Sequence, residues 1–417
     1  MDSGRQHEAL QAAMEHHRHG RLAEAEAIYR RILADDPNQP DALNLLGTLA
    51  HQAGNADAGV KLISRAIAAR PDAAEYHNNL AIALLALKRS DDAIAALRTA
   101  VKLRPDWAEA HYRLAYVLHD RGAYDAAIAE YQETLRLKPD LVEARNDLGT
   151  ALRERGRLDD ADAECRRVIE LRPDLAEAHH NLANVLRDLG LLDEAIAAYR
   201  RALALNADMP ITHSNLAYTL HFHPACDPAA IFEEHARWND RFAKPLATAA
   251  TATPHSNVHG DPDRPLRIGY VSPDFRNHPI GRFLSPIFAN HDRERFTICC
   301  YNDVAAPDAL TEQLRASADI WRETAALSDA QLHDLIRSDA IDILIDLTMH
   351  MKGNRLLVFA RRPALVQATY LAYCSTTGLS AIDYRITDPL LDPPDAKQPF
   401  YAEKSVWLPE TYWCYEP

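Results

Sequence analysis

The feature that most constrains the fold of this chain is a 34-residue period in its first half. Proline, small residues and large residues each recur at this spacing, and the large residues follow the small ones by four positions. The three series are Pro37, Pro71, Pro105, Pro139 and Pro173; Ala25, Gly59, Ala93, Ala127, Ala161 and Ala195; and Tyr29, Ile63, Leu97, Tyr131, Cys165 and Tyr199. A step of four residues returns to the same face of a helix. Each period therefore predicts helices that pack closely where the small residues lie.

A turn glycine completes the period and divides each unit into two short helices. These glycines are Gly20, Gly54, Gly122, Gly156 and Gly190. The pattern resembles the tetratricopeptide repeat family over roughly residues 5–220. It predicts about six repeats and a terminal helix in residues 1–222, stacked as a superhelix in which each unit buries its apolar face against its neighbours.

The first helices of such a superhelix usually line its concave surface, so one position on them is of interest for binding. It reads Leu45, Asn79, Arg113, Asp147, Asn181 and Asn215. An asparagine amide both donates and accepts hydrogen bonds and can hold a peptide backbone. We therefore predict a peptide groove at Asn79, Asn181 and Asn215; the alternative is that these are solvated helix residues.

Composition excludes several classes of partner. The formal charge of −14 argues against nucleic acid or an anionic membrane as the main partner. The sequence contains no run of about 18 apolar residues, so it predicts no membrane-spanning helix. The six cysteines form no Cys-x-x-Cys pair, which indicates reduced thiols and a cytoplasmic protein. The histidine clusters at 16–19 and 179–180 are interpreted as solvated or packed, and no metal site is expected.

After Tyr218 the period fails, and the chain changes character. Residues 223–265 are interpreted as a helical connector and linker. From residue 266 short β-rich runs alternate with helical stretches, which predicts a parallel, doubly wound α/β sheet of the Rossmann type in residues 266–417. The predicted strands are 266–271, 296–302, 341–347, 365–371 and 384–387, and the predicted helices are 280–290, 309–318, 329–338 and 355–361.

The carboxyl ends of these strands are where ligands of such sheets bind. Two histidines, a lysine and a hydroxyl-rich turn follow them, in the segments 272–278, 348–355 and 372–378. No Gly-x-Gly-x-x-Gly, Walker or Gly-x-Ser-x-Gly motif is present, so dinucleotide, P-loop and serine-hydrolase sites are not indicated.

Four segments, "GYVSPDFRNHPIGRFL", "NRLLVFARRPALVQATYLAY", "TTGLSAIDYRITD" and "YAEKSVWLPETY", resemble the nucleocytoplasmic protein O-GlcNAc transferase family. With the repeats before them, the resemblance covers essentially the whole chain. It implies an inverting, metal-independent glycosyltransferase with two facing Rossmann-like domains, the GT-B architecture. Such an enzyme moves N-acetylglucosamine from UDP-GlcNAc to Ser or Thr hydroxyls of proteins and needs no cofactor. A related branch, similar to SPINDLY, uses GDP-fucose. We leave open a homodimer through the repeats.

The resemblance also assigns candidate site residues. His278, flanked by Asn277 and Pro279, matches the active-site histidine, and an imidazole can position or deprotonate a hydroxyl near neutral pH. Asp334 aligns with a carboxylate that assists proton handling, although a single helical Asp is usually just solvated. Whether His278 acts as base or orienter stays open at this point.

Two further loops complete the expected cleft. His350 and Lys352 match one cleft loop of the family. The donor-sugar loop matches at Ala372, Thr376, Thr377 and Gly378. Its departures, Ala372 and Ser375 for glycine and Cys374 for proline, alter the backbone freedom there. Arg355, Arg361 and Arg362 fit either the cleft or a solvated helix surface.

The second Rossmann-like half, which would hold the uridine and pyrophosphate sites, has no counterpart in residues 266–417. Without a metal, a departing diphosphate needs fixed donors and a helix N-terminus. Three hypotheses follow: a transferase of which this sequence is a part, a non-catalytic repeat adaptor with a vestigial α/β domain, or a transferase that uses another sugar.

Overall fold

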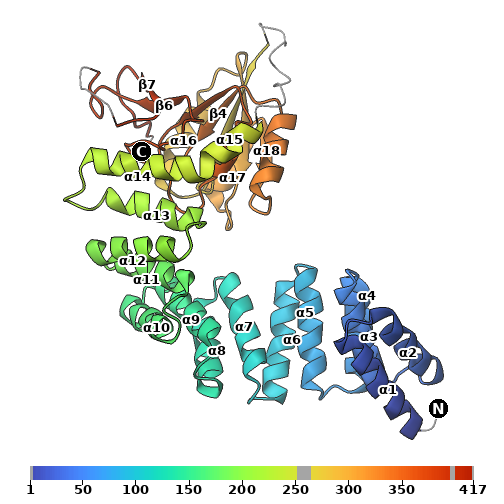
Figure 1. Cartoon of the computed structure of the whole chain (residues 1–417). Helices are drawn as coiled ribbons and strands as arrows, with labels where there is room; N and C mark the ends of the chain where they lie inside the picture. Colours follow the sequence, from blue (N-terminus) through green and yellow to red (C-terminus); the bar gives the residue numbers. More distant parts are fainter. Residues whose placement is uncertain (1–2, 251–263, 395–399, 416–417) are drawn as a thin grey trace. The chain divides into compact units, whose positions relative to one another are not determined.

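Two helices per 34-residue period form the first part of the chain. The computed structural model describes residues 3–250, 264–394 and 400–415. The first helices of successive repeats begin 34 residues apart from Pro40 to Pro210 (Figure 1). The helices are α1 Ser3–Arg18, α2 Leu22–Asp35, α3 Pro40–Gln52, α4 Ala56–Ala69, α5 Ala74–Ala86, α6 Ser90–Leu103, α7 Ala108–Asp120, α8 Tyr124–Leu137, α9 Val142–Glu154, α10 Leu158–Leu171, α11 Ala176–Asp188, α12 Leu192–Leu205, α13 Pro210–Leu220 and α14 Pro228–Trp238.

The turn inside each repeat requires a left-handed residue. All five predicted turn glycines have positive φ, from 72° to 86°. In the repeat that lacks the glycine, Lys88 takes this conformation with φ of 58°. A residue with a Cβ is strained there, so the glycine series reflects backbone geometry.

Small residues let the two helices of a repeat approach closely, as the sequence predicts. A Cβ added to Gly59 would lie 2.8 Å from the carbonyl oxygen of Gly47 on the paired helix. The large residues of the third series, from Tyr29 to Tyr199, are at most 1% exposed. The period therefore records helix packing.

The chain divides into two compact units, Met1–Leu189 and Gly190–Pro417. The last helices of the repeat pattern, α12 and α13, thus belong to the same unit as the α/β part, although the sequence period continues through them. One cause is that α13 packs against α14, and its Ser214 hydrogen-bonds His350 of the α/β part (3.0 Å). Helix α14 continues through a π-helical turn, η1 (Asn239–Ala243), into α15 (Lys244–Ala250). Residues 251–263 of the predicted linker lie outside the described residues.

A seven-stranded sheet forms the centre of the second unit, and all of its strand pairs are parallel, as predicted. The strand order is β3-β2-β1-β4-β5-β6-β7, so the direction of winding reverses between β1 and β4. The strands are β1 Leu266–Ser272, β2 Phe296–Asn302, β3 Ile320–Glu323, β4 Ile343–Asp346, β5 Val366–Thr369, β6 Tyr384–Thr387 and β7 Lys404–Trp407. Such a reversal opens a crevice at the carboxyl ends of the two strands, where ligands bind.

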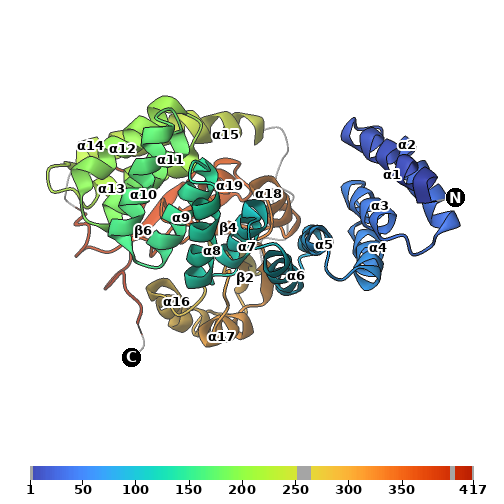
Figure 2. The ribbon, with the colours of Figure 1, turned by 90° about the horizontal axis from the view of Figure 1, so that it is seen from below.

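Helices cover both faces of the sheet. Helices α16 (Pro279–Ala289) and α17 (Ala309–Ser317) pack on one face through a cluster that includes Phe275 and Phe288. Helices α18 (Asp329–Ser338) and α19 (Leu356–Ala360) cover the other, together with Trp238 and Phe242 of the preceding helices. Figure 2 shows the two groups on opposite sides of the strands. This arrangement is the doubly wound fold that the alternation of β and α predicts.

The sequence did not predict β3 and β7. Each has only four residues and lies at an edge of the sheet, and most of its side chains are partly or fully exposed. A short edge strand lacks the continuous apolar run that identifies a buried parallel strand.

Candidate active site

The loop after β1 places His278 at the carboxyl edge of the sheet, next to the reversal in strand order. His278 is the N-cap of α16, and its Nδ1 accepts a hydrogen bond from the amide of Ile280 (3.3 Å). About a third of the side chain is exposed, and Asp274 Oδ2 lies 3.8 Å from Nδ1. Burial lowers the pKa of His278, an effect that Asp274 opposes. The ring is therefore neutral near pH 7, and the bond from Ile280 leaves its proton on Nε2.

The neighbours of His278 fix this loop rather than line a pocket. Asn277 and Pro279 are exposed. The amide of Asn277 donates to Asp308 (2.7 Å), and its side-chain oxygen accepts from Arg282 (3.0 Å). Pro279 occupies the first turn of α16, where a missing amide hydrogen costs nothing.

The loop after β4 approaches the loop after β1. A Cβ on Gly353 would lie 3.1 Å from Pro273, so the two loops touch at the crevice. Lys352 is exposed in this loop. Asp346 is buried and accepts from the amides of Thr348 and Met349, and burial raises its pKa to about 6.

His350 is fully buried and holds elements together. Its Nδ1 lies 3.0 Å from the Ser214 hydroxyl on α13, and its Nε2 lies 2.8 Å from the Thr377 carbonyl. The ring packs edge-on against Trp238 and His235. Both ring nitrogens therefore have protein partners, and in this structure the side chain does not face solvent.

The loop after β5 is also held from within. The Thr376 hydroxyl donates to Glu403 (2.7 Å), and Thr377 donates to the same carboxylate through its amide (2.7 Å) and its hydroxyl. Gly378 has φ of 70°, and a Cβ there would lie 2.5 Å from His235 Cβ. Ala372 is half-buried. The predicted threonines are thus buried, and Glu403, which the sequence did not single out, binds both.

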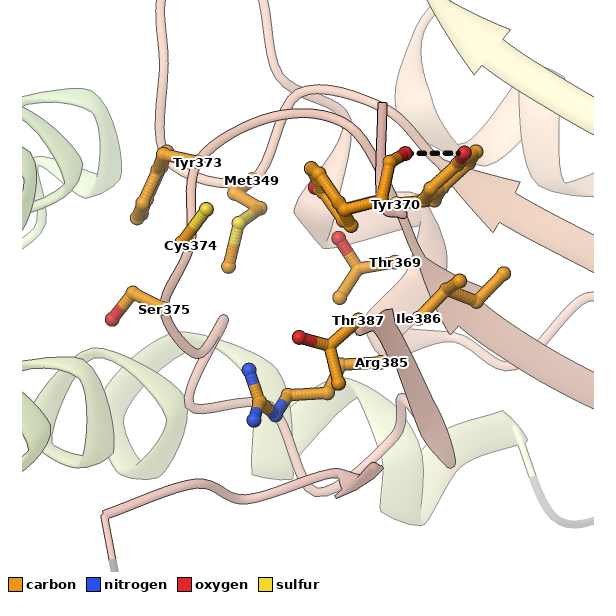
Figure 3. Close-up of a pocket in the computed structure, with 10 residues that line it drawn as sticks. Met349, Thr369, Tyr370, Tyr373, Cys374, Ser375, Arg385, Ile386 and Thr387 are labelled. Atoms are coloured by element: carbon orange, nitrogen blue, oxygen red, sulfur yellow. Dashed lines mark hydrogen bonds between the residues drawn. The ribbon is translucent and has the colours of Figure 1, made fainter. Parts of the chain in front are cut away.

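A small pocket opens where β5 and β6 end (Figure 3). Its lining is Met349, Thr369, Tyr370, Tyr373, Cys374, Ser375, Arg385, Ile386, Thr387 and Tyr412. Arg385 carries the positive charge of this lining; it pairs with Asp392 and stacks on Tyr401, 3.4 Å from the ring centre. Burial lowers the pKa of Arg385. The pocket joins the donor-sugar loop of the sequence prediction to β6, which had no predicted role.

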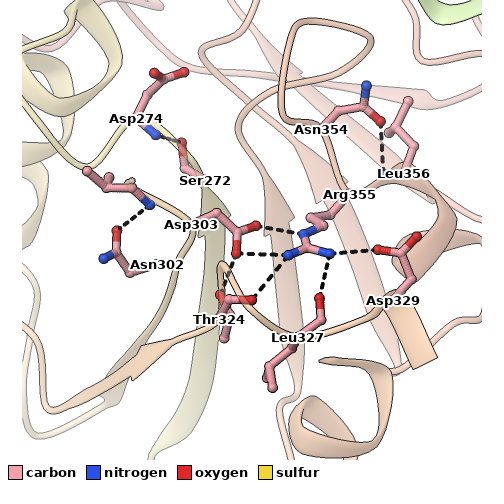
Figure 4. Close-up of polar contacts among 11 residues, drawn as sticks. Ser272, Asp274, Asn302, Asp303, Thr324, Leu327, Asp329, Asn354, Arg355 and Leu356 are labelled. Carbon is pink, nitrogen blue, oxygen red and sulfur yellow. Dashed lines mark hydrogen bonds and ion pairs between the residues drawn. The ribbon is translucent and has the colours of Figure 1, made fainter. Parts of the chain in front are cut away.

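Arg355 links the loops after β2, β3 and β4 (Figure 4). Its guanidinium donates to Asp303 (2.7 and 3.1 Å) and to Asp329 (2.9 Å), as well as to two backbone carbonyls. Burial alone would lower the pKa of Arg355, but the two carboxylates hold it above its ordinary value. Asp303 in turn donates its amide to the carbonyl of Ser272 (3.1 Å). Arg355 is therefore an anchored residue and not a solvated helix charge.

Asp334 lies on α18 with 81% of its side chain exposed, and its carboxylate contacts His333 (2.9 Å). In the part of the chain that the structure describes, no hydrogen bond joins Asp334 to the loops that follow β1, β4 and β5. The same part contains no cluster of three or more His, Cys, Asp or Glu side chains suited to a metal ion. None of its helices has the length and apolarity to cross a bilayer.

The predicted groove asparagines belong to a ladder of hydrogen-bonded side chains that joins consecutive first helices from α3 to α11. Its links are Asn79 to Asn44 (3.2 Å), Arg113 to Asn78 (3.1 Å), Tyr112 to Asp147 (2.8 Å) and Asn181 to Asn146 (2.9 Å). Each link spans 35 residues. Asn215 lies half-buried on α13 in the other compact unit.

Models of known protein families match both the repeats and the α/β part of the chain. Residues 218–416 match the family model of glycosyl transferase family 41. Tetratricopeptide repeat models match residues 16–83, 78–142, 118–185 and 183–221. A solved structure of a mutant O-GlcNAc transferase from Thermobaculum terrenum is similar, with a TM-score of 0.67 and 40% identity, over 73% of this chain and 58% of that one.

Two plant proteins are each similar to less than half of this chain. The probable UDP-N-acetylglucosamine–peptide N-acetylglucosaminyltransferase SPINDLY of Solanum lycopersicum is 40% identical over 191 residues, 45% of this chain and 20% of that protein. The Arabidopsis thaliana protein of the same description called SEC is 35% identical over 173 residues, 41% of this chain and 17% of that protein. The matched segment spans about a fifth of the length of these curated relatives.

Proposed function

We propose that the chain acts in protein O-glycosylation, because its residues 218–416 match the family model of glycosyl transferase family 41. The proposed reaction transfers N-acetylglucosamine from UDP-GlcNAc to Ser or Thr hydroxyls of other proteins, with inversion and without a metal. The observation that carries the proposal is the position of His278. A partly exposed histidine, neutral at pH 7, lies beside the reversal in strand order, where ligands of parallel sheets bind.

His278 has a defined part in this proposal. With Nδ1 accepting from Ile280, Nε2 carries a hydrogen and can donate it to the acceptor oxygen, which orients the hydroxyl. For Nε2 to remove a proton instead, Nδ1 would have to become a donor. Asp274, 3.8 Å from Nδ1, is the carboxylate that would accept that hydrogen. We assign the orienting role to His278, because the bond from Ile280 is the one present.

We assign the sugar of the donor to the pocket at the ends of β5 and β6. Hydroxyl groups of Thr369 and Thr387 and the guanidinium of Arg385 line it, and such groups hydrogen-bond sugar hydroxyls. The loop that the resemblance assigns to the donor sugar contributes Tyr373, Cys374 and Ser375. In this proposal Thr376 and Thr377 shape the loop through Glu403 and do not touch the sugar.

The ladder of the repeats receives the acceptor protein in this proposal. Asn79 and Asn181 are half-buried, and each donates one hydrogen bond within the ladder through its side-chain nitrogen. The second hydrogen on that nitrogen can bind a peptide backbone. We place the reaction in the cytoplasm, since all six cysteines are free thiols. A homodimer through the repeats is tested by the mass of the full chain in light scattering.

The test measures transfer from UDP-GlcNAc to protein acceptors by the full chain and by variants at His278. We expect His278→Ala to reduce transfer by about 100-fold, the scale of a positioned catalytic group. His278→Gln, whose amide can still donate, should retain transfer within about 10-fold. His333→Gln, at another histidine of the α/β part, is the matched control and should leave transfer unchanged.

Three other arms separate the remaining hypotheses. Full transfer by His278→Ala would remove this residue from the mechanism, and a loss in His278→Gln as large as in His278→Ala would favour a base over an orienter. Transfer from GDP-fucose but not from UDP-GlcNAc would identify the other donor. Loss of transfer with EDTA would contradict a metal-independent reaction. If the full chain neither transfers nor binds either nucleotide sugar, the adaptor hypothesis replaces the transferase.

A further inference from the structure

Two positions in the middle of the ladder carry opposite charges where the flanking positions carry amides. Asn79 and Asn181 occupy equivalent positions in their repeats. Between them, at the same 34-residue spacing, are Arg113 on α7 and Asp147 on α9. Arg113 makes the hydrogen bond that an asparagine makes at the equivalent positions, because its Nε donates to the Asn78 side chain on the preceding first helix (3.1 Å). The exchange of an amide for a guanidinium therefore keeps the ladder intact and adds a charge to it.

The charge of Arg113 has no counter-charge among the described residues. No ion pair joins its two terminal nitrogens to a carboxylate among the described residues. Burial lowers the pKa of Arg113, and no neighbouring charge opposes this effect. Other arginines of the repeats pair with acids, as Arg70 does with Asp41 and Arg121 with Asp91. A guanidinium that is partly desolvated without a counter-charge is destabilising on its own and favours an incoming anion.

The surroundings restrict the kind of anion. Tyr116 lies one turn after Arg113 on α7, and 58% of its surface is exposed. Asp147, at the next position, is held by Tyr112, and burial raises its pKa; Glu177 and Glu143 add to the effect. A ligand with negative charge along its whole length would therefore meet repulsion at α9, whereas one localised acidic group fits.

We propose that Arg113 recognises an acidic side chain, Asp or Glu, of the protein segment bound along the ladder, while Asp147 disfavours an acidic side chain at the adjoining position. The two free terminal nitrogens of a guanidinium match the two oxygens of a carboxylate. This inference rests on the proposed function, in which the ladder binds acceptor proteins. The asparagine amides of the ladder bind the peptide backbone and do not distinguish one peptide sequence from another. A contact from Arg113 would add a preference for particular side chains.

The experiment selects a displayed library of random 12-residue peptides on the full chain. With the wild type we expect Asp or Glu to be enriched at one position of the selected peptides. Arg113→Asn restores the amide of the row and should remove that enrichment, and Arg113→Glu should replace it with Lys or Arg. A selected peptide should bind Arg113→Asn at least about 10-fold more weakly than wild type, as expected for a charge-assisted contact.

A double-mutant cycle identifies the contact. Replacing the acidic residue of the peptide with its amide should weaken binding to wild type by the same factor and leave binding to Arg113→Asn unchanged. Arg121→Asn, at the C-cap of the same helix and paired with Asp91, is the matched control. Melting curves of the variants show whether they fold. An unchanged acidic preference in folded Arg113→Asn would overturn the inference.

Other outcomes distinguish this inference from the proposed function. If a peptide loses binding when its C-terminus is amidated, Arg113 reads a chain end, and the side-chain assignment is wrong. If the double variant Asn79→Ala, Asn181→Ala selects the same peptides with unchanged affinity, the ladder is not the binding surface and the proposed role of the repeats fails. Selection of no peptide by the wild type would overturn both.

Discussion

Arg355 is the side chain on which three loops of the α/β part converge. Its side chain is only 16% exposed, and Asp303, to which it donates two hydrogen bonds, is 7% exposed. Asp303 also donates to Ser272 at the end of β1, so the guanidinium supports the start of the loop that carries His278 (Figure 4). A single residue thus connects strand ends that are far apart in the sequence.

Replacing Arg355 with Met should destabilise the protein strongly. The change leaves the carboxylate of Asp303 buried without its ion-pair partner, which typically costs about 3–5 kcal/mol. Chemical denaturation of the full chain measures the change in the free energy of unfolding. Arg361→Met is the control, since the buried Nε of Arg361 has no partner among the described residues; we expect a change within about 1 kcal/mol. Equal losses in the two variants would contradict the anchoring role of Arg355.

At the scale of elements, β1, its loop and α16 form a closely packed unit. Gly281 on α16 lies under the loop, and a Cβ there would come within 2.2 Å of the Arg276 carbonyl oxygen and 3.0 Å of that of Asp274. These are backbone atoms, which cannot move aside as a flexible side chain can. The contact fixes the path of the loop up to the His278 cap.

We therefore expect Gly281→Ala to displace the loop. Overpacking of this kind costs about 1–3 kcal/mol, and the NMR signals of the His278 ring should shift. Gly122→Ala is the control, because Gly122 has positive φ but open space around it. It should lower the melting temperature modestly and leave the His278 signals in place. A His278 spectrum unchanged in Gly281→Ala would show that the loop does not depend on this contact.

The repeat elements contain a further 34-residue series that the sequence pattern did not reveal. It is His77, His111, Arg145 and His179, and each side chain hydrogen-bonds the carbonyl of the proline six residues earlier at 2.8–3.0 Å. The signal was present in the spacing. It was overlooked because histidine and arginine on a helix look like solvated residues until the carbonyl partner is seen.

At the scale of the second compact unit, buried and half-buried histidines join α13 and α14 to the loops of the sheet. His221, His235 and His350 pack in sequence, with ring centres 5.3 and 4.7 Å apart. Burial lowers the pKa of His221 to about 3 and that of His235 to about 4, and it holds the pKa of His350 well below 6.5. The rings are therefore neutral in the folded protein at pH 7.

This cluster predicts a loss of stability in acid. Because the folded pKa values lie below the unfolded value of 6.5, the unfolded state binds more protons as the pH falls below 6.5. The stability present above pH 6.5 should decrease from there toward pH 4, by an amount on the order of a few kcal/mol. Denaturation of the full chain between pH 8 and 4.5 measures it. His235→Gln should flatten the dependence, and His19→Gln, an exposed control, should not; a dependence unaffected by His235→Gln would contradict the assignment.

The sequence by itself determined the repeat architecture, the doubly wound α/β half and the strand ends at which His278 lies. These are local patterns, in which a period of 34 residues or an alternation of strand and helix can be counted along the chain. The position of His278 follows from the end of one strand and the start of the next helix.

Only the tertiary structure decided what the other candidate residues do. His350 meets Ser214, 136 residues away, and Thr376 meets Glu403, 27 residues away. Arg355 finds Asp303 across 52 residues. Their burial depends on which strands become neighbours and which helices cover them, and no local pattern encodes those pairings. For the same reason the repeat pattern continues through α13, while packing assigns that helix to the α/β unit.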